Sequence, residues 1–182
     1  GAKIAESIMG QALENDSSLG NWIRMLVLDT DQNDLGKLKN LNERSQYQFS
    51  TPETVYRILE RNPDIEDKWC YSRDDPEMAQ DILGMSLIEG AGQIRILTRM
   101  ALHDRFVNDG LLNKMEDVIG SLTYHDDEQR FKGSIHVLML GSIAGATGSG
   151  SFTQVALALK QAARNRDVLA TVRGVFLLPD VY

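Results

Sequence analysis

The stretch IHVLMLGSIAGATGSG, residues 135–150, decides the fold class of this chain. Its first six residues form a nearly continuous apolar run, which is typical of a strand buried on both faces of a parallel sheet. A glycine-rich segment follows, and the apolar residues of 152–163 then recur with helical spacing. A second apolar run, 172–178, is followed by Pro179. The sequence therefore predicts a βαβ unit, and with it an α/β fold in which helices cover both faces of a parallel Rossmann-like sheet.

The remaining segments fit one domain over residues 1–182. Apolar spacing predicts helices at 2–14, 93–106 and 111–122. A further helix is expected at 52–61, with Thr51 as its N-cap and Pro52 as its first residue. A strand is expected at 22–28, a polar loop at 29–50 and a charged turn at 124–132. Residues 35–80 carry no recognisable motif and are interpreted as an irregular, insertion-like region.

Composition excludes several classes of function. The chain has 19 Lys and Arg against 26 Asp and Glu, a net charge of −7, which disfavours non-specific binding to nucleic acid or to an anionic membrane surface. The longest apolar stretch, Ile135–Ala146, is shorter than the roughly 20 residues that span a bilayer. Cys70 is the single cysteine, so an internal disulfide and a zinc site built from cysteines are excluded. The opening residues show no signal-peptide pattern, and we expect a cytoplasmic location.

The loop Gly145–Gly150 is the strongest candidate for a binding site. Its glycines would let a ligand approach the backbone, and the first turn of the following helix presents N–H groups to an anion. Thr147, Ser149 and Ser151 add hydroxyl donors. Gly148→Val is then expected to abolish anion binding and to leave the fold cooperative. The alternative is a tight turn that binds nothing. No lysine follows the last glycine, so this is not the GxxxxGK[ST] phosphate loop.

Two other segments have the composition of ligand-binding loops. Gly90-Ala91-Gly92-Gln93 is a second glycine turn before a predicted helix, and two such helix starts can face one crevice of a parallel sheet. Asp29-Thr30-Asp31 follows a predicted strand. Its carboxylates could hold a hydrated Mg²⁺ or contact a ribose, or could form an ordinary Asx turn.

Metal and catalytic patterns are weak by comparison. His103, His125 and His136 share no metal-ligand spacing, and no nucleophile–base set can be derived from the order of residues. Neither a protein-bound metal site nor a catalytic residue is predicted.

Together these loops resemble the tubulin/FtsZ superfamily, and more closely its large prokaryotic tubulin-like branch. Residues 144–150 resemble the signature G-G-G-T-G-[ST]-G, with alanine at two glycine positions. Residues 90–93 resemble the family's G-A-G loop for the terminal phosphates, 29–31 its Asn-Thr-Asp turn, and 1–2 the end of its first glycine loop. The nucleotide-binding residues that the resemblance implies are Gly1, Ala2, Asp29, Thr30, Asp31, Gly90, Ala91, Gly92, Gln93, Ala144, Gly145, Ala146, Thr147, Gly148, Ser149 and Gly150.

The resemblance implies binding of GTP or GDP, with Mg²⁺ held through the phosphates, and self-association into filaments. Hydrolysis would be completed between subunits of the intact protein. The base-reading helix and the acidic catalytic loop of the family would lie beyond Tyr182, so we expect no turnover from residues 1–182 alone.

Two alternatives stay open. The first is an NAD(P)-binding Rossmann domain of an oxidoreductase, in which Asp29 would hold the ribose, although it lies 28 residues after Gly1 rather than about 20. The second is a degenerate tubulin-like scaffold without nucleotide, in which Ala144 and Ala146 mark a lost site.

Overall fold

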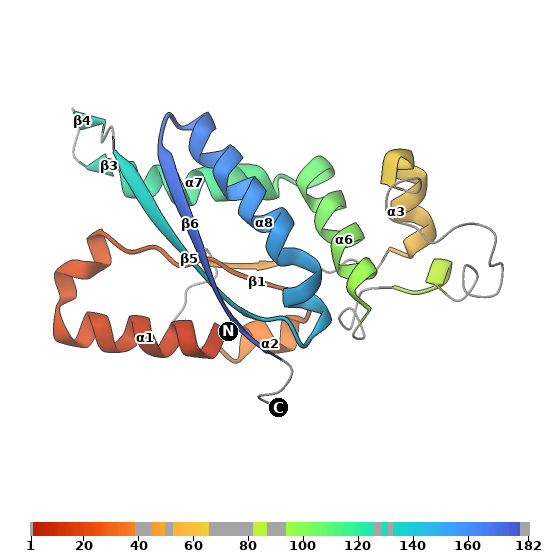
Figure 1. Ribbon diagram of the computed structural model, residues 1–182, viewed down its shortest axis with the longest axis horizontal. Coiled ribbons are helices and arrows are strands. Elements are labelled where there is room, and N and C mark those ends of the chain that lie inside the picture. The colour runs from red at the N-terminus through yellow and green to blue at the C-terminus, as the bar shows by residue number, and fades with distance from the viewer. Residues whose placement is uncertain are drawn as a thin grey trace.

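The computed structural model describes residues 2–38, 45–49, 53–65, 82–86, 94–125, 129–130 and 133–178 (Figure 1). Its helices are α1 (Ala2–Asn15), the 3-10 helix η1 (Ser17–Asn21), α2 (Gln32–Gly36), α3 (Val55–Arg61), α6 (Arg95–Asn108), α7 (Leu111–Thr123) and α8 (Ala146–Asn165). Its strands are β1 (Val27–Asp29), β2 (Gln46–Gln48), β3 (Tyr124–His125), β4 (Gln129–Arg130), β5 (Ser134–Ser142) and β6 (Leu169–Leu177).

β5, α8 and β6 form the predicted βαβ unit. The two strands pair in parallel along their whole length, from Ser134 opposite Leu169 to Ser142 opposite Leu177. α8 connects them and packs against both strands as well as against α6 and α7, so it lies between the strand pair and α6 (Figure 1). The α/β class and the parallel strand direction are thereby confirmed.

The two faces of the β5–β6 pair differ in burial. Ile135, Met139 and Ala170 pack against the main core. Leu138 and Val175 belong to the opposite face, because side chains alternate along a strand, and they are 59% and 57% exposed. The prediction that residues 135–140 are buried on both faces is therefore wrong for this face.

A second parallel pair lies in the N-terminal part of the chain. β1 pairs with β2, with Val27 opposite Gln46 and Asp29 opposite Gln48. The predicted strand 22–28 thus begins too early, and the predicted loop 29–50 contains α2 and β2. These two elements are short and polar, so no apolar period marks them. Within the described residues the two parallel pairs are not hydrogen-bonded to each other, and one sheet with helices on both faces stays a prediction.

The predicted helices are present, with boundaries shifted by up to three residues. α6 and α7 supply much of the core, in which Met100, Leu102 and Met115 are fully buried. α3 begins at Val55 rather than at Pro52, because Thr54 is its N-cap and accepts a hydrogen bond from the Arg57 N–H at 3.4 Å. Thr51 and Pro52 lie outside the described residues. The predicted turn 124–132 contains the short antiparallel pair β3–β4.

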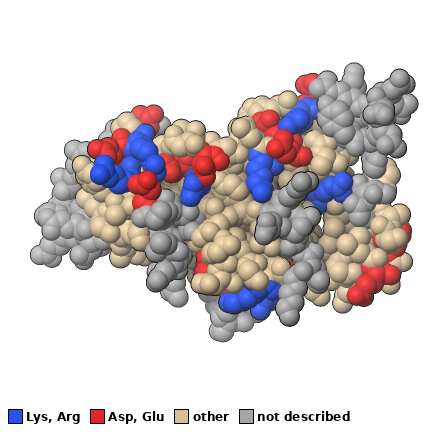
Figure 2. Space-filling model, turned by 180° about the vertical axis from the view of Figure 1, so that it is seen from behind, with Lys and Arg blue, Asp and Glu red and all other residues tan. Residues whose placement is uncertain are grey.

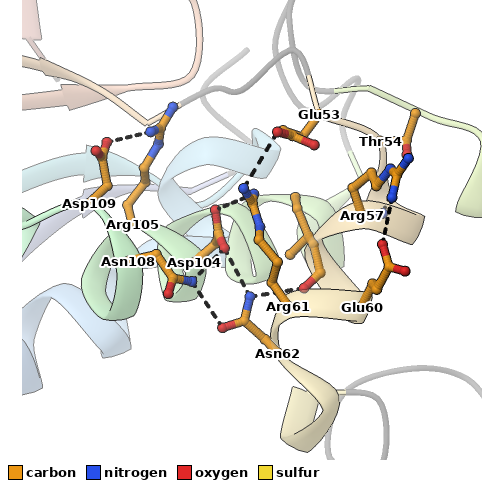
Figure 3. Close-up of polar contacts among 11 residues, drawn as sticks. Glu53, Thr54, Arg57, Glu60, Arg61, Asn62, Asp104, Arg105, Asn108 and Asp109 are labelled. Atoms are coloured by element: carbon orange, nitrogen blue, oxygen red, sulfur yellow. Dashed lines mark hydrogen bonds and ion pairs between the residues drawn. The ribbon is translucent and has the colours of Figure 1, made fainter.

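A buried polar network joins α3 to α6 (Figure 3). Asp104 of α6 is 3% exposed, and its carboxylate accepts hydrogen bonds from Arg61 at 3.1 Å and from Asn62 and Asn108 at 2.9 Å each. Arg61 also pairs with Glu53 at 3.5 Å. Because a buried carboxylate needs such partners, the network fixes how α3 sits on α6.

Candidate functional site

The glycine loop leads from β5 into the first turn of α8. Gly145 is the N-cap of α8 and provides no side-chain cap. The Ser149 N–H donates to the Gly145 carbonyl at 3.2 Å, so the N–H groups of Ala146, Thr147 and Gly148 precede the hydrogen bonds of the helix. An uncapped helix start of this kind can bind an anion.

The starts of α6 and α8 have no side-chain cap, whereas several other helix starts have one. Asp16, Asp31 and Thr54 cap η1, α2 and α3 with side-chain oxygen atoms. α6 begins after Ile94 and, like α8, has no side-chain cap. The two helices that follow the predicted glycine loops thus begin without a side-chain acceptor for their first N–H groups.

The three hydroxyl groups of the loop have different partners. Ser149 donates to the Gly145 carbonyl at 2.6 Å, and Ser151 donates to the Thr147 carbonyl at 2.5 Å. The Thr147 hydroxyl instead lies 3.0 Å from the Thr30 hydroxyl, at the end of β1. Thr147 is therefore the hydroxyl that reaches from the loop to another part of the fold.

The glycines of the loop also differ in their surroundings. A β-carbon on Gly148 would overlap the Ser142 carbonyl, and one on Gly150 would lie 2.6 Å from the Arg95 carbonyl oxygen and 2.8 Å from Thr98 Cβ. At Gly145 a β-carbon would meet nothing within 4 Å. Gly148 and Gly150 are thus required by packing, and Gly145 borders open space. A valine side chain at Gly148 would overlap the Ser142 carbonyl, which counts against the expectation that Gly148→Val leaves the fold cooperative.

The turn after β1 is held by the Asp29 carboxylate. It accepts hydrogen bonds from the N–H groups of Thr30 at 2.7 Å and Asp31 at 3.2 Å. Burial raises the pKa of Asp29 above its ordinary value. Asp31 caps α2 by accepting from the Asn33 N–H at 2.8 Å. The Asx turn that the sequence allowed is present, and it places Thr30 beside Thr147.

Parts of two predicted loops fall outside the described residues. Gly90, Ala91, Gly92 and Gln93 lie outside the described residues, as does Gly1; Ala2 is the first residue of α1. α6 begins two residues after Gln93, and the contact between Gly150 and Arg95 brings the first turns of α6 and α8 side by side. Arg95 and Thr98 could not be singled out from the sequence, since neither belongs to a recognisable motif.

Charge and metal-binding groups are unremarkable elsewhere in the described residues. Lys and Arg are interspersed with Asp and Glu on the face shown in Figure 2. Among the described residues of the chain, no group of three or more His, Cys, Asp or Glu side chains could hold a metal ion. No helix in the described ranges is long and apolar enough to cross a membrane.

Comparison with known proteins identifies a family. The model of the tubulin-like family matches residues 1–182 of the chain, which confirms the resemblance to the tubulin/FtsZ superfamily. No curated protein and no solved structure matches.

Proposed function

The chain belongs to the tubulin-like family, and from that premise we propose that it binds a guanine nucleotide with the phosphates at the first turn of α8. The phosphates would face the N–H groups of Ala146, Thr147 and Gly148, beside the open space at Gly145. The resemblance adds Gly90–Gln93 to the proposed nucleotide-binding residues. We also propose that the chain is of the large prokaryotic branch and is cytoplasmic.

The observation that carries this proposal is the meeting of two uncapped helix starts with the end of β1. Gly150 and Arg95 bring α6 against α8, and Thr30 and Thr147 bring the β1 turn against the same first turn. Oriented N–H groups and a hydroxyl can bind phosphate without any lysine, which fits the acidic composition. Asp29 and Asp31 lie at the same turn, where Mg²⁺ held by the phosphates would offset their negative charge.

The two alanines of the loop bear on the scaffold alternative. Ala146 is 6% exposed and belongs to the main core, so its methyl group points into the protein rather than into a ligand site. Ala144 is exposed. The replacement at 146 is therefore compatible with phosphate binding, and this favours a working site over a degenerate one.

Binding is tested by calorimetry on the natural full-length protein with GTP, GDP, ATP and NAD⁺, each in the presence of Mg²⁺. We expect GTP and GDP to bind and Thr147→Val to weaken GTP binding about tenfold, since one hydrogen bond to a charged group is lost. Thr153→Val, at an exposed position of the same helix, is the matched control and should bind like wild type. If NAD⁺ binds and GTP does not, the oxidoreductase alternative is favoured. If none of the nucleotides binds, the scaffold alternative is favoured.

Assembly is proposed as the consequence of binding. We propose that the protein self-associates into filaments and that GTP hydrolysis is completed between subunits. Sedimentation tests the self-association and phosphate release tests the hydrolysis, each with GTP and with GDP. Pelleting that depends on GTP, with phosphate release that rises with polymer, would support it. No change in sedimentation with either nucleotide would contradict it.

A further inference from the structure

The hydroxyl pair Thr30–Thr147 joins the turn after β1 to the first turn of α8, across 117 residues of sequence. Thr30 is 2% exposed, so its hydroxyl group is withdrawn from bulk water. The Asp29 carboxylate fixes its backbone through the N–H groups of Thr30 and Asp31. Thr30 thus presents its oxygen to Thr147 from a rigid, buried position.

The direction of this hydrogen bond decides what Thr147 can do. A hydroxyl has one hydrogen to donate and two lone pairs to accept with. If Thr147 donates to Thr30, its hydrogen is used; if Thr30 donates to Thr147, the Thr147 hydrogen can point elsewhere. A phosphate oxygen only accepts, so it favours the second arrangement.

We propose that Thr30 is a positioning residue, whose hydroxyl donates to Thr147 and so turns the Thr147 O–H toward the phosphate at the first turn of α8. This inference rests on the proposed function. Ser149 and Ser151 do not need such a partner, because each donates to a carbonyl of its own helix. Thr147 alone among the three depends on a residue from another element for its orientation.

The test is a double-mutant cycle of GTP affinity in the natural full-length protein, with Thr30→Val, Thr147→Val and the double variant. Valine keeps the shape of threonine and removes the hydroxyl. We expect Thr30→Val to weaken GTP binding about tenfold when Thr147 is present and less than about twofold in the Thr147→Val background. Thr30→Ser keeps the hydroxyl and should keep wild-type affinity to within about twofold, which a purely steric role would not predict.

The outcomes separate this inference from the proposed function. Wild-type protein that binds no GTP overturns both. Two results would overturn the positioning role alone, provided that Thr147→Val weakens GTP binding. In the first, Thr30→Val weakens GTP binding equally with and without Thr147. In the second, Thr30→Val does not weaken it at all. A Thr30→Ser variant as weak as Thr30→Val would also overturn the positioning role alone. If Thr30→Val does not fold, Thr30→Ala removes the hydroxyl without adding a methyl group to the buried site, and the same cycle is measured with it.

Discussion

Gly148 lies so close to Ser142 that a β-carbon on Gly148 would overlap the Ser142 carbonyl oxygen. Gly145, three residues earlier, has open space in the corresponding position. From the sequence alone both glycines have one role, the approach of a phosphate to the backbone. The structure separates them: Gly148 allows α8 to start directly against the end of β5, whereas a β-carbon on Gly145 would meet only open space.

Gly148→Ala should therefore destabilise the protein, by about 1–3 kcal/mol, because a methyl group is forced against backbone that cannot rotate away. Gly145→Ala is the matched control and should change the free energy of unfolding by less than about 0.5 kcal/mol. Urea denaturation without nucleotide measures both. Equal unfolding midpoints for the two variants would show that the loop relaxes around Gly148.

Thr98 offers a stabilising substitution between α6 and α8. Its side chain is fully buried, and its hydroxyl oxygen has no hydrogen-bond partner in the described part of the chain. Thr98→Val keeps the shape and removes the unpaired group, so the free energy of unfolding should rise by about 1 kcal/mol. Thr98→Ala, which leaves a cavity, should lower it. A loss of stability with valine would indicate that a buried water satisfies this hydroxyl.

The long periodic segments of this fold were predictable, and the short ones were not. α6, α7, α8 and β5 each place enough apolar residues in sequence to reveal their period. α2 has five residues and β2 has three, and both are polar. β2 is stabilised by pairing with the distant strand β1, and α2 is stabilised by its N-cap Asp31. Neither interaction produces an apolar period in the sequence.

The candidate site was predictable in its location but not in its details. Glycine loops at helix starts and an acidic turn after a strand predict one crevice, and the Thr30–Thr147 contact places two of the three segments together. The partners of Ser149 and Ser151 could not be predicted, since a free serine and one bonded to its own helix look alike in sequence. Asp104 lies seven residues after Leu97 and three after Ala101, on the buried face of α6, but its hydrogen-bond partners could not be predicted from the sequence.

Asp104 should be far more sensitive to substitution than an exposed acid. Asp104→Ala leaves Asn62 and Asn108 without their shared acceptor and Arg61 without one of its carboxylates. We expect a loss of about 1–3 kcal/mol in the free energy of unfolding, because buried amide donors lose a charged acceptor. Lys37→Ala breaks the exposed Lys37–Asp34 pair, whose side chains are 58% and 55% exposed, and serves as control. It should cost less than about 1 kcal/mol. Similar losses for both would contradict the structural role of the network.

Asp29 predicts a specific dependence of stability on pH. Burial raises the pKa of Asp29 from its ordinary 3.8, and the nearby Asp34 and Asp31 act in the same direction, against the two backbone hydrogen bonds. The folded state therefore holds this proton more tightly than the unfolded state. Its contribution to stability is complete below the unfolded pKa and is lost as pH rises through the folded pKa.

Asp29→Asn removes this titration and keeps an oxygen that can accept from Thr30 and Asp31. The free energy of unfolding of Asp29→Asn minus that of wild type should thus increase as pH rises above about 4 and level off once Asp29 is ionised in the folded state. Other carboxylates titrate in both proteins and largely cancel in this difference. Urea denaturation of both proteins at a series of pH values between about 4 and 7 measures it. A difference that stays flat or falls over this range would mean that the folded protein does not disfavour the charged form of Asp29.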